Sequence, residues 1–226
     1  MPTSGLSWSA EDSPDVDADA VRRAIREAFD ERAEAYDESA MHRALASEAA
    51  AFAELATVRT VLDVATGTGL VLRALAERRP QLRMTGVDVS AGMLAVARRA
   101  LPSAEWVQAD AVALPAADGS VDLVTCATAL HIIVDTDAAI SEWARVLAPG
   151  GRVVTATFAQ GDHEPGHVHA QTHDRAAPRY PRVHGPFASP EALARTVAGA
   201  GFAVSRHALW SYADDHVLIA ELTLDG

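Results

Sequence analysis

The chain has 226 residues, of which 49% are apolar, and this length and composition suit one α/β domain with a small embellishment. Its formal net charge is −12, from 31 acidic and 19 basic residues, and every basic residue is an arginine. Such a charge repels phosphate backbones and argues against DNA or RNA as a partner, while the lack of a long apolar run and the acidic N-terminus argue against membrane insertion and secretion. We therefore expect a cytoplasmic protein.

Residues 1–18 are rich in Ser, Pro, Gly and acidic side chains, a composition that favours a disordered acidic tail. From residue 19 to residue 56 apolar side chains recur at spacings of three and four, which predicts two helices. Tyr36 lies between them. It either contacts a ligand of the domain or simply pins the helix to it as an amphipathic residue.

The segment 60–78 predicts a strand, a glycine-containing loop and a helix. Asp63 stands where the strand ends, and Gly67 and Gly69 let a ligand approach bare backbone beside the first amides of the helix. The dinucleotide fingerprint requires a further glycine where this chain has Leu72, so a pyrophosphate ligand is disfavoured. A carboxylate at Asp63 suits a ligand with an ammonium group.

The pattern of a strand followed by an acid or a helix repeats along the chain. Asp88 ends a second strand, at the position where a ribose diol would be bound, although dinucleotide folds share this feature. Ser90 is the expected N-cap of the next helix. Residues 104–111, 119–131 and 145–154 predict a third strand, a fourth strand, and a helix with a Pro-Gly-Gly turn and a fifth strand.

In this order the motifs resemble the class I S-adenosylmethionine-dependent methyltransferases, whose first motif reads acidic-x-Gly-x-Gly-x-Gly; here Ala65 stands in place of the first glycine. The resemblance implies an α/β, Rossmann-like fold with a seven-stranded, mostly parallel sheet, an antiparallel last strand and an N-terminal helical lid. It divides a single domain, 19–226, into a helical lid (19–56), a cofactor-binding core (58–158), a histidine-rich insertion over the substrate (159–188) and a closing helix with two strands (189–226).

The resemblance also implies which residues bind the cofactor S-adenosyl-L-methionine and its product S-adenosyl-L-homocysteine. The implied contacts are Tyr36, Asp63, Ala65, Thr66, Gly67, Gly69, Asp88, Val89, Met93, Asp110, Ala111 and Ala127. Asp110 would lie near the adenine amino group. The single cysteine, Cys126, falls inside an apolar strand and is expected to be a packed small hydrophobe.

Three histidines are the candidate catalytic residues. His131 follows the fourth strand, where the family faces its acceptor; it is either a general base or a residue that packs the strand end. His169 and His173, in the insertion, are the rival bases. A metal site there would need regular helix, which the prolines of the insertion oppose, so we expect no metal.

The expected function is methyl transfer to an oxygen, nitrogen or carbon atom of a small molecule, in specialised metabolism, by a monomer or homodimer. One alternative is a protein of this fold that binds the cofactor for a reaction other than methylation. The other is an NAD(P)-dependent oxidoreductase.

Overall fold

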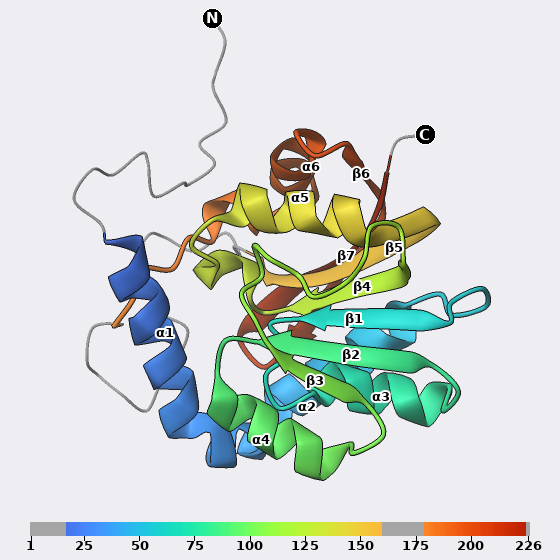
Figure 1. The fold of residues 1–226 in the computed structure, drawn as a ribbon. Helices are drawn as coiled ribbons and strands as arrows, with labels where there is room; N and C mark the ends of the chain where they lie inside the picture. The colour runs from blue at the N-terminus through green and yellow to red at the C-terminus, as the bar shows by residue number, and fades with distance from the viewer. Residues whose placement is uncertain (1–16, 160–178, 225–226) are drawn as a thin grey trace, which may run out of the picture.

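The computed structural model describes residues 17–159 and 179–224. Its centre is a seven-stranded sheet in the order β3-β2-β1-β4-β5-β7-β6 (Figure 1). The first five strands pair in parallel, while β7 is antiparallel to β5 and β6 is antiparallel to β7. The sheet confirms the predicted Rossmann-like fold class, including its antiparallel last strand.

The strands are β1 (Thr60–Val64), β2 (Arg83–Asp88), β3 (Glu105–Gln108), β4 (Val121–Ala127), β5 (Leu147–Phe158), β6 (Phe202–Tyr212) and β7 (Asp215–Leu224). The helices are α1 (Ala18–Arg32), α2 (Ala40–Phe52), α3 (Leu70–Arg78), α4 (Ala91–Ala100), α5 (Thr136–Val146) and α6 (Pro190–Ala198), with short 3-10 turns η2 (Ala33–Glu38), η3 (Leu130–Ile132) and η4 (Gly185–Phe187). None of these described helices is long and apolar enough to cross a bilayer.

Two apolar cores cover the two faces of the sheet. Because side chains alternate along a strand, Leu62 of β1 packs in the core shared with α5 and α6, whereas its neighbour Val61 packs in the core shared with α2, α3 and α4. Trp143 of α5 and Leu75 of α3 are completely buried in these two cores. Burial on both faces explains why the strands read as continuous apolar runs.

Helix starts follow the capping residues in the sequence. The side chain of Ser90 accepts a hydrogen bond from the Met93 amide at the start of α4, which confirms the predicted N-cap, and Ser189 does the same for α6. Asp17 is the N-cap of α1, and the helix begins at Ala18. The tail predicted over residues 1–18 therefore overlaps the start of this helix. The rest of that tail, residues 1–16, lies outside the described residues.

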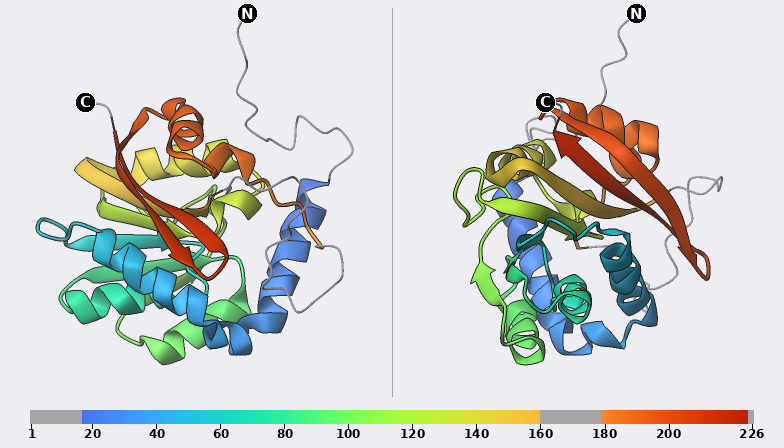
Figure 2. Two further views of the ribbon diagram at one scale, coloured as in Figure 1. Left: turned by 180° about the vertical axis from the view of Figure 1, so that it is seen from behind. Right: turned by 90° about the vertical axis from the view of Figure 1, so that its right-hand side faces the viewer.

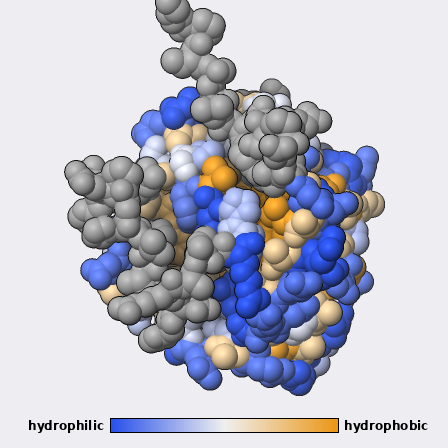
Figure 3. All heavy atoms as spheres, turned by 90° about the vertical axis from the view of Figure 1, so that its left-hand side faces the viewer, coloured by the Kyte–Doolittle hydropathy of each residue, from blue (hydrophilic) through white to orange (hydrophobic). Residues whose placement is uncertain are grey.

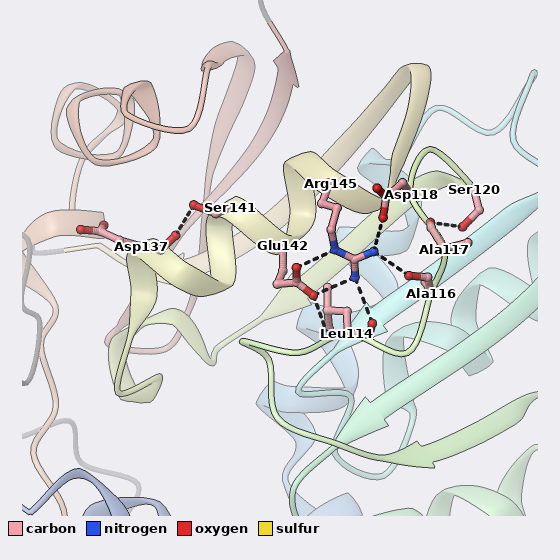
Figure 4. Close-up of polar contacts among 9 residues, drawn as sticks. All are labelled: Leu114, Ala116, Ala117, Asp118, Ser120, Asp137, Ser141, Glu142 and Arg145. Atoms are coloured by element: carbon pink, nitrogen blue, oxygen red, sulfur yellow. Dashed lines mark hydrogen bonds and ion pairs between the residues drawn. The ribbon is translucent and has the colours of Figure 1, made fainter.

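Arg145 of α5 anchors the loop that leads into β4 (Figure 4). Its guanidinium donates to the carbonyl oxygens of Leu114 and Ala116 and to the carboxylates of Glu142 and Asp118, at 2.6 to 3.1 Å. The Leu114 amide also donates to Glu142 Oε2 at 2.8 Å. The loop therefore bonds to α5 both through its carbonyl oxygens, which accept from Arg145, and through an amide, which donates to Glu142. This clamp fixes the strand β4 relative to the helix packed on it.

Helix α1 lies across the edge of the sheet where the parallel strands end (Figures 1 and 2). Asp30, near its C-terminus, accepts hydrogen bonds from Ser90 Oγ at 2.6 Å and from the Gly92 amide at 2.8 Å, and both donors belong to the start of α4. A negative charge there also complements the N-terminal end of the α4 dipole. The predicted helical lid is therefore attached to the core through α4.

Candidate functional site

A cavity opens between the carboxyl ends of the strands and the first two helices. With its open mouth it encloses about 1090 Å³ of empty space, part of which is open to solvent. Asp63, Asp88 and Asp110, from the ends of three neighbouring strands, all line it. On the α1 side of the molecule, hydrophobic surface gathers near the middle of the face and hydrophilic residues surround it (Figure 3).

Asp63 is a buried carboxylate at the end of β1. Its two oxygens accept hydrogen bonds from Thr66 Oγ1 and Thr125 Oγ1, both at 2.5 Å, and no cationic side chain of the described residues forms an ion pair with it. Burial raises the pKa of Asp63 to about 6, against the lowering effect of the two hydroxyl donors. A buried carboxylate of this kind attracts a cationic group of a ligand.

Asp88 lies beside it at the end of β2. Its oxygens accept from the Gly67 amide at 2.8 Å and the Ser90 amide at 2.9 Å, so this carboxylate ties the loop after β1 to the start of α4. Burial raises its pKa and the backbone donors oppose the rise. The neighbouring Val89 also lines the cavity.

The loop after β1 is built from left-handed residues. Ala65 has φ +53°, a region that glycine adopts freely and alanine only with strain, and Gly67 has φ +57°. Thr128, just beyond β4, is a second strained residue, with φ +54°. Ala65, Gly67 and Thr128 all line the cavity, and strained backbone of this kind is concentrated at functional sites.

Asp110 is paired within the described structure. The guanidinium of Arg22, on α1, lies with its Nε 3.3 Å from Asp110 Oδ2 and its Nη1 3.0 Å from Asp19 Oδ1. Arg22 lines the same cavity, so this ion pair closes one end of it between α1 and the turn after β3. Ala111 and Ala127 complete the wall on the strand side.

Aromatic rings form the opposite end of the cavity. Tyr36 stacks face to face on His42, with 4.7 Å between ring centroids and 5° between planes, and Phe29 lies 6.4 Å from Tyr36. All three line the cavity. Burial raises the pKa of Tyr36, whereas burial and the charge of Arg32 lower that of His42 to about 4, which keeps its imidazole neutral.

The structure brings ten of the twelve predicted cofactor contacts to the cavity wall, and the exceptions are Gly69 and Met93. Gly69 is the N-cap of α3 and faces the indole of Trp106 instead. Met93, on α4, is fully buried.

Of the three predicted catalytic histidines the structure describes only His131, and it is not among the residues that line the cavity. His131 is buried in the 3-10 turn η3; its ring stacks on His184, 4.5 Å away, and meets the edge of Phe158 at 5.5 Å. His169 and His173 lie outside the described residues, as does most of the predicted insertion. In the described parts of the chain no cluster of side chains could hold a metal ion.

Several cavity residues were not predicted from the sequence. Thr68, His42 and Leu45 line it from the loop and from α2, and Ile132 and Val134 line it from the segment after β4. The spacing of apolar residues in α2 indicated a helix, but did not indicate which face would meet the cavity. Cys126 is buried as predicted, and burial raises the pKa of its thiol.

Comparison with known proteins agrees with this architecture. Residues 61–151 match a family model described as "Methyltransferase domain". The demethylmenaquinone methyltransferase of Thermus thermophilus is 37% identical over 165 residues, which cover 65% of this chain and 75% of that protein.

Two further matches cover more of the chain. The malonyl-[acyl-carrier protein] O-methyltransferase of Halorhodospira halophila is 37% identical over 191 residues, which cover 80% of this chain and 62% of that protein. A solved structure of a Haloferax volcanii complex contains the Trm112 methyltransferase activator and a chain described as a methyltransferase. This structure superposes on the present one with a TM-score of 0.71 at 22% sequence identity, and the match covers 91% of this chain and 98% of that chain. By sequence and by fold, the chain belongs to the class I S-adenosylmethionine-dependent methyltransferases.

Proposed function

We propose that this chain transfers a methyl group from S-adenosylmethionine to a small-molecule acceptor. The observation that carries the proposal is the convergence of Asp63, Asp88 and Asp110 on one cavity with the left-handed loop after β1. The relatives described above add support, because their names give demethylmenaquinone and a malonyl group on a carrier protein as the molecules they methylate.

The residues present fit the cofactor. Asp63 is a buried carboxylate with no ion-pair partner among the described residues, which complements the ammonium of the methionyl part. Asp88 would accept hydrogen bonds from the ribose hydroxyls, and Asp110 would lie at the adenine end together with Arg22. A side chain at Gly67 would meet no atom within 4 Å, so the bare backbone leaves room for the ligand there.

The bound cofactor supplies an electrophilic methyl group on a sulfonium. The contribution of the chain is to hold the acceptor in line with that group and to exclude water from it. Phe29, Tyr36 and Ile132 provide apolar surface for this purpose. His131 stays a predicted base; its stacking on His184 also suits a role in positioning the turn after β4.

Calorimetric titration of the purified protein tests the proposal. S-adenosylhomocysteine is expected to bind at one saturable site and NAD to bind more weakly or not at all. Asp88→Ala should weaken S-adenosylhomocysteine binding, with Asp137→Ala as the matched control at an exposed position. Absence of saturable binding would remove the proposal.

A turnover assay distinguishes methyl transfer from the alternative of a protein that binds the cofactor for another reaction. Incubation with labelled S-adenosylmethionine and a panel of acceptors should give S-adenosylhomocysteine together with a methylated product. Binding without any methylated product would favour a protein that uses the cofactor for another reaction.

A further inference from the structure

Arg32 carries an unpaired positive charge next to the cavity. It is the last residue of α1, and its guanidinium carbon lies 3.8 Å from the centroid of the Phe29 ring and 5.8 Å from that of Tyr36. Its Nη2 reaches the hydroxyl of Tyr180 only at 3.5 Å, and its Nε is buried without a hydrogen-bond partner. A buried guanidinium nitrogen without an acceptor is costly.

The acidic residues around Arg32 are all engaged elsewhere. Glu31 pairs with Arg179 at 2.8 Å, Glu34 with Arg99 at 2.6 Å and Asp37 with Arg73 at 2.5 Å. Asp30 accepts from the start of α4. Within the described residues no carboxylate forms an ion pair with Arg32, whereas Arg22 at the other end of the cavity has two.

Arg32 is not itself among the residues that line the cavity, but two aromatic side chains beside it are. Phe29 and Tyr36 touch or approach the guanidinium and also line the cavity, so Arg32 lies one side chain away from it. His42, stacked on Tyr36, lines the cavity with a buried Nδ1 that has no hydrogen-bond partner. A neutral imidazole offers one donor and one acceptor, so this end of the cavity has an unused polar group on its wall and a cation directly behind that wall.

We propose that Arg32, framed by Phe29 and Tyr36 and assisted by His42, recognises a carboxylate of the methyl acceptor. The guanidinium supplies a positive charge directly behind this end of the cavity, where its stacking on Phe29 holds it in place, and His42, which lines the cavity, supplies the polar contact. A dianionic phosphate fits less well, because Asp63 and Asp88 line the same cavity and repel a double negative charge more strongly. The inference rests on the proposed function and names the substrate class of the same site.

The cofactor has a carboxylate of its own, so the first experiment separates the two sources. Affinities for S-adenosylhomocysteine and for 5′-methylthioadenosine, which lacks the amino-acid carboxylate, are measured calorimetrically on wild type, Arg32→Gln, Arg32→Lys and Arg99→Gln. Arg99 is the matched control, since it also pairs with the 30–37 segment but is exposed. For each ligand, the dissociation constants measured on the four proteins should agree within about twofold. A selective loss of S-adenosylhomocysteine affinity in Arg32→Gln would assign Arg32 to the cofactor and overturn the proposal.

The second experiment uses proteins saturated with S-adenosylhomocysteine and the probes octanoate, cinnamate and succinate, each beside its neutral amide. At least one carboxylate should bind wild type and Arg99→Gln about tenfold or more tightly than its amide. That preference should fall below about threefold in Arg32→Gln and be partly restored in Arg32→Lys. Equal binding of every acid and amide to wild type, or an unchanged preference in Arg32→Gln, would overturn the inference while leaving cofactor binding, and with it the proposed function, intact.

Discussion

The buried carboxylate of Asp63 predicts how cofactor affinity changes with pH. Its pKa is raised by burial from 3.8 to about 6, so it loses its charge in a range where most carboxylates keep theirs. If Asp63 binds the ammonium of the cofactor, only the ionised form contributes. Affinity should therefore fall as the pH is lowered through about 6.

The size of the change follows from the same pKa. With a pKa of about 6, roughly one-eleventh of Asp63 is ionised at pH 5 and roughly ten-elevenths at pH 7, so the dissociation constant should rise about tenfold, or about 1.4 kcal/mol. The titration is confined to pH 5–7, because an α-amino group itself begins to lose its proton near pH ~7.7–8.0.

Calorimetry with S-adenosylhomocysteine at pH 5, 6 and 7 measures this change, and adenosine serves as the control ligand. Adenosine lacks the ammonium group but keeps the ribose, so any titration of Asp88 appears with both ligands and can be subtracted. Asp63→Asn should bind S-adenosylhomocysteine weakly with little pH dependence. Equal pH dependence of the two ligands, or a persistent tenfold change in Asp63→Asn, would refute the assignment of Asp63 to the ammonium.

The stability of the free protein should change in the opposite sense. An acid whose pKa is higher in the folded state than in the unfolded chain contributes stability below its unfolded pKa, and this contribution is lost as the pH rises through the folded value. The Asp63 contribution is therefore present below pH 3.8 and lost above about 6. The melting temperature of unliganded Asp63→Asn at pH 7 should equal or exceed that of wild type, and a lower value would contradict this reasoning.

Three further predictions concern the framework of the site. In Gly86→Ala the new Cβ would lie 2.4 Å from Trp106 Cζ3, so urea unfolding should show a free energy of unfolding lower by about 1–3 kcal/mol. Gly199→Ala, where no atom lies within 4 Å of the new Cβ, should be near neutral, and equal unfolding midpoints for the two variants would refute the clash. Arg145→Ala removes the clamp on the loop before β4 and should cost about 1–3 kcal/mol in the same assay, with Ser141→Ala as a mild control. Asp30→Ala should speed hydrogen exchange in α1 and weaken S-adenosylhomocysteine binding several-fold, unlike Glu27→Ala on the same helix; unchanged exchange would argue against Asp30 as the attachment of the lid.

The strand ends of this fold could be predicted because the information is local. Asp63 and Asp88 follow short apolar runs, and parallel strands bring their carboxyl ends to one edge of a sheet, so their meeting follows from topology alone. The N-caps Ser90 and Ser189 are equally local. Strand β5 shows the limit of such patterns, since its pairing with β4 begins at Leu147 and shifts register before Arg152, where the Pro-Gly-Gly turn was expected to precede the strand.

The helical wall of the cavity could not be predicted, because it depends on how distant segments pack. The facing of His42 toward Tyr36 and the pairing of Arg22 with Asp110 are set by the docking of α1 and α2, which no local spacing encodes. The position of His131 shows the same limit. Its place after a strand could be predicted, but the stacking of its ring on His184, 53 residues further along the chain, could not.

The indole of Trp106 connects two glycines that are far apart in the sequence. A Cβ at Gly69 or at Gly86 would lie 2.4 Å from the same ring, so a side chain at either position forces the tryptophan to shift. Related chains should therefore vary at these three positions as a set: those with a smaller residue at 106 can admit alanine or serine at 86, and those that keep the ring should keep glycine there. Sequence variation at the two glycines is thus limited by Trp106, a residue of β3 that does not line the cavity.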